Sequence, residues 1–387
     1  MPLKARARGG CPTAQIEDVW ASAASGKELD KGDGDAYKGE FKKALSEIAF
    51  FDTPNGGALM RSSAAILLAF LLTLFLVPHA VSEARNLNSP DPPDQGSSVA
   101  PYLGRWDLTL HAADRDYPSW LELRGESGQL KAQYVGRWGN ARPLPKVELS
   151  HGTLTFVSPK EEEDSPEDMV FQGKLSGKAL AGSVTGPKGT PWQWAGQRAP
   201  SLKRMGDPTW GKPVELFNGK DLSGWREDKP GSSPAWKVDD GTLVSPGHGP
   251  ELINSNKFED FKLHIEFNCG PGANSGVYLR GRYEVQIEDN SIQEPPSHHT
   301  GGVYGFFAPT PEQPRRPGVW QNFDITLIGR TITVVQNGQT IIDHQEIPGI
   351  TGGALDSHEG LPGPIYLQGS EDGHVAYRNI AVTPAKY

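Results

Sequence analysis

One stretch in the C-terminal half of the chain gathers groups that could do acid–base chemistry. Residues 274–289 read NSGVYLRGRYEVQIED. Alternate side chains of a β-strand point to opposite faces, so the apolar residues face one way and a polar set faces the other: Tyr278, Arg280, Glu284, Gln286 and Glu288. Carboxylates beside an arginine and an amide can exchange a proton with a ligand and stabilise developing charge. The stretch is therefore the first candidate for a site.

A second strand, FKLHIEF at residues 261–267, shows the same alternation and places His264 and Glu266 on its polar face. We expect the consecutive strands to combine their polar residues into one floor. The simpler alternative is a solvated face with cross-strand ion pairs, each contributing roughly 0.2–1 kcal/mol. The density of arginine, glutamate, glutamine and tyrosine, with few lysines, favours a site.

The loop SIQEPPSHHTGGVYG, residues 291–305, carries the adjacent His298 and His299. Beside acidic residues, two histidines could ligate a divalent metal that polarises a carbonyl group. The alternative, which we favour, is a Pro/Gly loop with surface histidines. No cofactor is required by the sequence, and a divalent metal remains open.

Length and composition bound the architecture and the partners. A chain of 387 residues predicts two or three domains. The net charge of -9 without a basic stripe argues against a nucleic-acid partner. The counts of Gly, 46, and Pro, 33, favour a turn-rich β protein. With only Cys11 and Cys269, separated by processing, no disulfide framework is expected, and no protein partner is indicated.

A targeting segment begins inside the chain at Met60. Arg61 precedes an apolar run at residues 64–77, and small residues follow at Ser82 and Ala84. This pattern is typical of a secretory signal peptide, whereas a membrane-spanning helix needs roughly 20 apolar residues. We predict a signal peptide at residues 60–84 and a secreted or periplasmic product with no stable membrane anchor after cleavage. Residues 1–59 are then an over-extended N-terminus, disordered or partly helical; the alternative is a cytoplasmic head on a signal anchor.

The remaining chain reads as two β domains joined by linkers, so the expected fold class is all-β. Residues 85–99 are a linker, and residues 100–197 form a small antiparallel β domain, a lipocalin-like barrel or a sandwich, opening on the Gly-x-Trp of residues 104–106. Residues 198–212 form a second linker. Residues 213–387 are again strands, with a hairpin turn at Asn337-Gly338, and predict a β-sandwich.

Tryptophans are frequent in both domains. The N-terminal domain contains Trp106, Trp120, Trp138, Trp192 and Trp194. These tryptophans either fill a small barrel, which we favour, or contact carbohydrate at the mouth of the barrel. In the C-terminal domain Trp225, Trp236 and Trp320 could stack on sugars, but we expect two of the three in the core.

An ordered series of fragments over residues 213–387 resembles the 3-keto-disaccharide hydrolase domain family. The fragments are ELFNGKDLSGW, the W-x-V-x-D-G of residues 236–241, FEDFKLHIEF, NSGVYLRGRYEVQIED, GGVYG, the W-x-N of residues 320–322 and GPIYLQG…YRNIAV. The resemblance implies a concanavalin-like β-sandwich, or jelly roll, that acts on glycosides whose C3 hydroxyl is oxidised to a ketone. One departure is that Glu288, not an apolar residue, precedes Asp289.

A C3 ketone makes the C2 hydrogen acidic, so the expected reaction is base-assisted elimination followed by hydration. We predict Glu284 as the base, Arg280 as the group that stabilises the enolate, and Asp289 or Glu266 as the acid. The expected oligosaccharide or glycoside would be bound by Asn274, Tyr278, Gln286, His264, Tyr304, Trp320 and Gln368. The rival hypothesis is a non-catalytic secreted carbohydrate-binding protein on the same sandwich.

Overall fold

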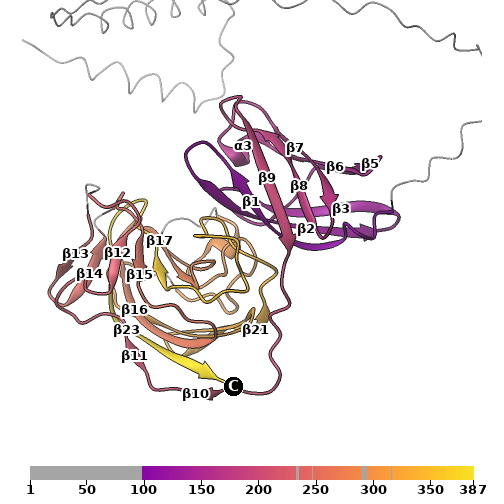
Figure 1. Cartoon of the computed structure of the whole chain (residues 1–387). Helices are drawn as coiled ribbons and strands as arrows, with labels where there is room; N and C mark the ends of the chain where they lie inside the picture. The colour runs from indigo at the N-terminus through magenta and orange to yellow at the C-terminus, as the bar shows by residue number, and fades with distance from the viewer. Residues whose placement is uncertain (1–97, 232–234, 246, 290–293, 315) are drawn as a thin grey trace, which may run out of the picture. The chain divides into compact units, whose positions relative to one another are not determined.

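The computed structural model describes residues 98–231, 235–245, 247–289, 294–314 and 316–387 (Figure 1). All of them fall in a single compact unit of the chain. The predictions for the N-terminal extension, the signal peptide and most of the first linker lie outside the described residues. Among the described residues, no helix is long and apolar enough to cross a membrane.

The N-terminal domain is one antiparallel sheet of nine strands in the order β4-β3-β2-β1-β9-β8-β7-β6-β5. Its elements are β1 (Gly104–His111), β2 (Asp116–Glu126), β3 (Gln129–Val135), β4 (Arg142–Pro143), β5 (Lys146–Ser150), β6 (Thr153–Ser158), the short helix α3 (Lys160–Glu163), β7 (Met169–Ser176), β8 (Ala179–Thr185) and β9 (Pro191–Arg198). The sheet curls so that β3 approaches β5, which gives the barrel-like domain that the short alternating strands predicted.

Aromatic side chains fill this curled sheet. Phe156 and Phe171 stack with ring centroids 4.5 Å apart, and Trp106 and Trp194 are fully buried beside them. Trp192 is buried in the same cluster, so the preference for core filling is confirmed for these three tryptophans. Trp120 is also buried, but on the other face of the sheet, where it belongs to the core cluster of the C-terminal domain and meets Phe306 with centroids 5.7 Å apart. Trp138 differs, because 40% of its surface is exposed.

The C-terminal domain is built from two sheets. The first has the order β13-β14-β23-β16-β19-β20-β21, with β10 and β11 paired to β23, and the second has the order β12-β15-β22-β17-β18. The elements are β10 (Thr209–Trp210), β11 (Val214–Glu215), β12 (Trp225–Glu227), β13 (Lys237–Asp239), β14 (Thr242–Ser245), β15 (Leu252–Asn254), β16 (Phe261–Cys269), β17 (Asn274–Leu279), β18 (Tyr283–Glu288), the 3-10 helix η1 (Pro296–His298), β19 (Gln321–Ile328), β20 (Thr331–Gln336), β21 (Gln339–Glu346), β22 (Tyr366–Leu367) and β23 (Val375–Lys386). Figure 1 shows β16 and β23 side by side in the curved first sheet.

The two sheets pack face to face through the apolar halves of their alternating strands. Phe261, Leu263 and Ile265 of β16 share one buried cluster with Val277 of β17 and Val285 of β18. The expected all-β class, with a two-sheet sandwich after a small barrel-like domain, is confirmed.

Two local predictions for the sandwich are also confirmed. Trp225 and Trp236 are buried in its core, whereas Trp320 is only partly buried. Asn337 and Gly338 join β20 to β21 with φ angles of 50° and 80°, as a type I′ turn requires.

The expected common polar floor is not formed. β16 belongs to the first sheet, whereas β17 and β18 belong to the second. Because the apolar faces of both sheets meet in the core, their polar faces point to opposite sides of the sandwich. His264 and Glu266 are thus separated from Glu284 by the thickness of the domain, and the prediction that they share one face was wrong.

Candidate functional site

A cavity of about 390 Å³ lies over the polar face of the second sheet. Its volume is within the usual range for small-molecule sites. Several residues selected from the sequence line it: Asn274, Tyr278, Glu284, Gln286, Tyr304 and Gln368. The alternation of β17 and β18 places the first four of these side chains on the cavity side, and Tyr304 and Gln368 join them from outside these two strands.

Strand register fixes the centre of the site. Tyr278 of β17 lies directly opposite Glu284 on β18 and opposite Tyr366 on β22. The rings of Tyr278 and Tyr366 stack with centroids 4.3 Å apart and an interplanar angle of 21°. The two phenols form a rigid central part of the cavity floor.

Glu284 occupies space that a glycine leaves open. A Cβ atom on Gly276 would lie 2.1 Å from Glu284 Oε1, so the carboxyl group rests over a residue without a side chain. Only 3% of Glu284 is exposed. Burial raises the pKa of Glu284 well above its usual value, and the nearby carboxylates of Glu251 and Glu371 raise it further. Burial therefore favours the protonated form of Glu284.

The hydrogen bonds of Tyr278 agree with a protonated Glu284. The Tyr278 hydroxyl lies 2.8 Å from Glu284 Oε2 and also 2.8 Å from the Gly352 carbonyl oxygen. One phenolic proton serves one of these acceptors at a time. A neutral Glu284 can donate its own proton to the phenol oxygen, while Tyr278 donates to Gly352, so that both bonds are made.

Glu251, immediately before β15, is a second titratable group in the same cavity. Burial raises its pKa to about 7, although hydrogen bonds from the Gly369 amide and the Tyr366 hydroxyl oppose the rise. The Gly369 N–H donates to Glu251 Oε2 at 2.7 Å. A carboxyl group with this pKa can accept or release a proton near neutral pH.

A third carboxyl group, Glu371, borders the cavity. Burial and the neighbouring Asp372 raise its pKa. Asn274 and Gln368 each donate to it at 3.3 Å. Asn274 and Gln368, which were predicted to bind sugar, therefore also orient the Glu371 carboxylate.

Sequence reasoning missed Glu251, Glu371 and Tyr366. The two acids lie in the turns GHGPEL and QGSEDG, next to very short strands, and no alternating pattern distinguishes them from surface acids. The available signal was their place in Gly-rich turns at the ends of strands, where binding residues are frequent.

Arg280 does not reach the cavity. It adopts a left-handed φ of 53° in the turn between β17 and β18, which breaks the alternation on which its assignment rested. The guanidinium is buried and donates to the Gly329 carbonyl at 2.7 Å and to the Tyr283 hydroxyl at 3.0 Å. The expectation that Arg280 stabilises an enolate at this site does not agree with its position.

Glu266 and His264 form a surface network on the first sheet. Glu266 accepts hydrogen bonds from Arg378 and Asn379, both at 2.7 Å, and His264 contacts Asp324 at 2.7 Å. Burial acts to raise the pKa of Glu266, but these hydrogen bonds lower it overall. Neither residue lines the cavity.

Trp320 also lies outside the cavity. The Arg378 guanidinium covers its ring at 3.9 Å from the centroid. One face of the indole is thus occupied by a cation, and the predicted sugar contact has no support from its position.

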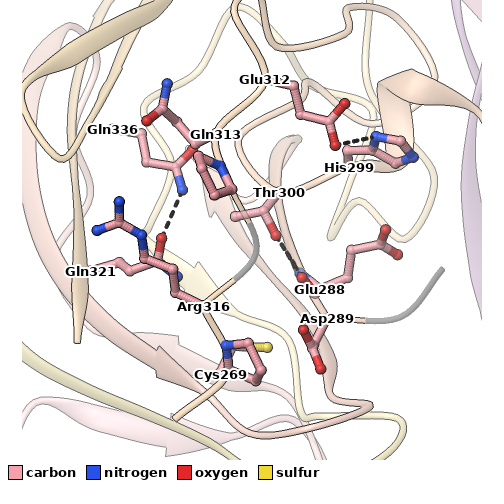
Figure 2. A pocket seen from close by; sticks show the side chains of 12 residues that line it. Cys269, Glu288, Asp289, His299, Thr300, Glu312, Gln313, Arg316, Gln321 and Gln336 are labelled. Carbon is pink, nitrogen blue, oxygen red and sulfur yellow. Dashed lines mark hydrogen bonds and ion pairs between the residues drawn. The ribbon is translucent and has the colours of Figure 1, made fainter. Parts of the chain in front are cut away.

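Asp289 and His299 border a different, much smaller cavity (Figure 2). Its volume of about 20 Å³ leaves room for little more than a water molecule. His299 Nδ1 lies 2.9 Å from Glu312 Oε1, and Asp289 accepts the Gly272 N–H at 3.2 Å. A sugar ring does not fit here, so these residues are separated from the main site.

His298 is partly buried and packs its ring on Tyr304 with centroids 4.1 Å apart. Its nitrogens contact Asn140 Nδ2 at 3.0 Å and Glu294 Oε2 at 3.2 Å, and burial lowers its pKa. Within the described parts of the chain, no three His, Cys, Asp or Glu residues are grouped to hold a metal ion. A metal site at His298 and His299, the less favoured alternative from the sequence, gains no support from these contacts.

Comparisons with known proteins concern the C-terminal domain. Residues 212–383 match the family described as 3-keto-alpha-glucoside-1,2-lyase-like domain. A 3-keto-disaccharide hydrolase from Bacteroides thetaiotaomicron is 21% identical over 167 residues, 34% of this chain. The chain spans 58% of that relative's length.

Two solved structures are also similar. A Parabacteroides distasonis protein provisionally described as a glycosyl hydrolase has a TM-score of 0.38 and 20% identity, over 45% of this chain and 94% of its own. A Bacillus licheniformis β-glucanase has a TM-score of 0.26 and 11% identity, over 47% and 100%. The family match over residues 212–383 confirms the resemblance predicted for residues 213–387.

Proposed function

We propose that the C-terminal domain cleaves 3-keto-glycosides by elimination and hydration in the cavity over β17, β18 and β22. The observation that carries this proposal is a pair of buried acids in one cavity, Glu251 with a pKa of about 7 and Glu284 with a pKa raised well above its usual value. Two buried carboxyl groups with raised pKa values are suited to act as base and acid in one reaction. The family of the domain supports the same chemistry.

In the proposed reaction, the ionised Glu251 removes the proton from C2, and the electron pair of the C2–H bond moves to form an enolate on the C3 oxygen. The enolate then collapses to the ketone as the C1–O bond breaks, giving a C1=C2 enone. Glu284 gives its proton to the leaving oxygen. The ionised Glu284 then takes a proton from water as the hydroxyl adds to C1, and Glu251 returns its proton to C2, so that both acids regain their starting states and the net reaction is hydrolysis.

This assignment reverses the role expected for Glu284. A base must be ionised, and burial favours the protonated form of Glu284 by raising its pKa well above the usual value, whereas the pKa of Glu251 is about 7. Gln286, whose amide can donate to Glu284 Oε1 at 3.3 Å, and Asn274 line the cavity, which supports a role for both in holding sugar hydroxyls.

The test is to incubate the full chain with methyl 3-keto-glucoside and with the unoxidised methyl glucoside in D₂O. We expect cleavage of the oxidised substrate alone, with deuterium at C2 of the sugar product, because proton removal at C2 needs the ketone. Cleavage of both substrates without deuterium at C2 would instead indicate direct glycoside hydrolysis. Binding without turnover would favour the carbohydrate-binding alternative.

We also propose that the protein acts outside the cytoplasm, because residues 60–84 have the pattern of a secretory signal peptide. N-terminal sequencing of the mature protein should find a start shortly after Ala84. A mature chain that retains residues before Met60 would contradict this.

A further inference from the structure

The N-terminal β domain supplies part of the wall of the same cavity. Arg115, Tyr117 and Trp138 line it together with Glu284 and Tyr278 of the sandwich. Four other tryptophans of this domain are buried, but Trp138 is 40% exposed. Its exposed ring therefore faces a site that also holds the two acids.

Neighbouring side chains hold the Trp138 ring in place. Tyr117 meets it edge-on with centroids 5.4 Å apart. The guanidinium groups of Arg115 and Arg137 each lie 5.4 Å from its centroid, within the range of a cation–π interaction. Arg137 is itself buried and fixed by Glu163, to whose Oε2 its Nε donates at 3.4 Å. The indole is thus a positioned aromatic surface rather than a loose surface side chain.

A continuous set of contacts connects this wall to Glu284. Gly139, the residue after Trp138, packs against Gly352 so closely that a Cβ atom on Gly352 would lie 2.2 Å from the Gly139 carbonyl oxygen. The Gly352 carbonyl accepts the Tyr278 hydroxyl, which also bonds to Glu284. These contacts therefore link the wall that carries Trp138 to Glu284, the group proposed to protonate the leaving oxygen.

A second contact holds the same loop over the site. Asn140 Nδ2 lies 3.0 Å from His298 Nε2, and the His298 ring stacks on Tyr304, which lines the cavity. Gly305 also packs against Asn140, where an added Cβ atom would meet Asn140 Cβ at 2.5 Å. The loop at residues 138–140 is thus part of the site's fixed structure.

Resting on the proposed function, we propose that the N-terminal β domain forms the leaving-group side of the substrate site. The Trp138 face stacks on a ring carried by the leaving group, either a second sugar or an aromatic ring, and Arg115 donates to its oxygens. Stacking on a ring contributes binding energy that a methyl leaving group cannot obtain. The domain therefore sets which glycosides bind well, while the sandwich acids carry out the bond breaking.

The test compares Trp138→Ala with the full-length parent on three 3-keto-glucosides, with methyl, 4-nitrophenyl and glucosyl leaving groups. We expect KM to rise about tenfold for one or both ring-bearing substrates, equivalent to about 1.4 kcal/mol, with KM for the methyl compound and kcat nearly unchanged. The ring that loses affinity identifies the ligand class. An equal change for the methyl substrate, or no change for either ring, overturns the proposal.

The matched control is Trp210→Ala. Trp210 is also partly exposed and lies 4.3 Å below the Lys262 ammonium group, but it is not among the residues that line the cavity. We expect its three KM values to equal those of the parent. The same pattern of losses in both variants would mean that the effect is not local to the cavity wall, and would overturn the proposal.

A direct measurement of binding tests this proposal independently of the proposed reaction. If no 3-keto-glycoside is cleaved, calorimetry with the unoxidised 4-nitrophenyl glucoside and glucosyl-glucose still tests the wall. Weaker binding to Trp138→Ala than to the parent supports it. Equal binding, or no binding of either ligand to the parent, overturns it whatever the reaction is.

Discussion

Glu284 and Glu266 occupy equivalent positions in the pattern of their strands, yet they differ in environment. Both alternate with core residues, on β18 and β16 respectively. Glu284 is covered by loops, and burial raises its pKa. Glu266 lies on the outer side of the other sheet, where hydrogen bonds from Arg378 and Asn379 lower its pKa. The same residue type in the same pattern has a raised pKa in one sheet and is a surface ion-pair partner with a lowered pKa in the other.

The difference shows that cover by loops, and not alternation along the strand, raises the pKa of a carboxyl group. The loop at residues 301–304 pairs with β18, through the Gly301 N–H to the Gln286 carbonyl at 2.8 Å and the Tyr304 N–H to the Glu284 carbonyl at 3.1 Å. The segment around Gly352 closes another side. Removing water raises the energy of the ionised form, and β16 has no such cover over Glu266.

The largest expected effect comes from Glu284→Gln. The amide keeps the shape but has no acidic proton to give, so kcat should fall by about 10²–10⁴ while sugar binding is retained. Steady-state kinetics and calorimetry check both parts. Glu266→Gln is the matched control, with unchanged kinetics and a loss of less than about 1 kcal/mol in unfolding free energy. Unaltered turnover in Glu284→Gln would remove Glu284 from the reaction.

A smaller effect is expected from moving the carboxyl group without replacing it. In Gly276→Ala the new methyl would lie 2.1 Å from Glu284 Oε1, so the carboxyl group must shift. A misplacement of about 1 Å can reduce the rate about 10²-fold, which single-turnover kinetics can measure. Gly125→Ala is the control, because its methyl meets no neighbour closer than 3.9 Å. Equal rates in the two variants would contradict the importance of this contact.

The smallest effect is a pH dependence from Glu251, whose pKa is raised to about 7. Because the base must be ionised, kcat/KM should rise about tenfold per pH unit below pH 7 and then level off. The raised pKa also means that the contribution of Glu251 to the free energy of unfolding is fully present below about pH 4.5 and falls by about 3 kcal/mol as pH rises through 7. Urea unfolding at pH 5 and pH 8 should show this loss in the parent.

Glu251→Gln gives the corresponding control. The amide does not titrate. The rise of kcat/KM with pH and the loss of unfolding free energy that Glu251 causes between pH 5 and pH 8 should therefore both disappear. An unchanged pH profile in this variant would assign the titration to another group, with Glu371 the next to replace.

The sequence predicted the fold well because the fold depends on patterns that are local. Alternation in β16, β17 and β18 fixed which side chains enter the core, and Asn337-Gly338 fixed a hairpin. The same alternation placed Tyr278 and Glu284 on the cavity side. What alternation does not contain is the sheet to which each strand belongs, and this is why Glu266 was grouped with Glu284.

The other differences in the site have physical causes of the same kind. Arg280 was assigned by a period of two, but a left-handed residue in a turn does not follow that period. Glu251 and Glu371 lie on turns whose position depends on long-range packing. Trp138 was grouped with core tryptophans because a sequence does not show which indole of a curled sheet remains exposed. Predictions that depended on one strand succeeded more often than those that depended on how two segments meet.

The hydroxyl of Tyr278 has a consequence for motion. Its oxygen lies 2.8 Å from both Glu284 Oε2 and the Gly352 carbonyl. In the proposed reaction Glu284 gives up its proton, and the phenolic proton of Tyr278 can then turn from the Gly352 carbonyl to the new carboxylate. Gly352 is also the residue against which Gly139 packs. We therefore expect the protonation of Glu284 and the Tyr278–Gly352 hydrogen bond, next to the loop that carries Trp138, to change together.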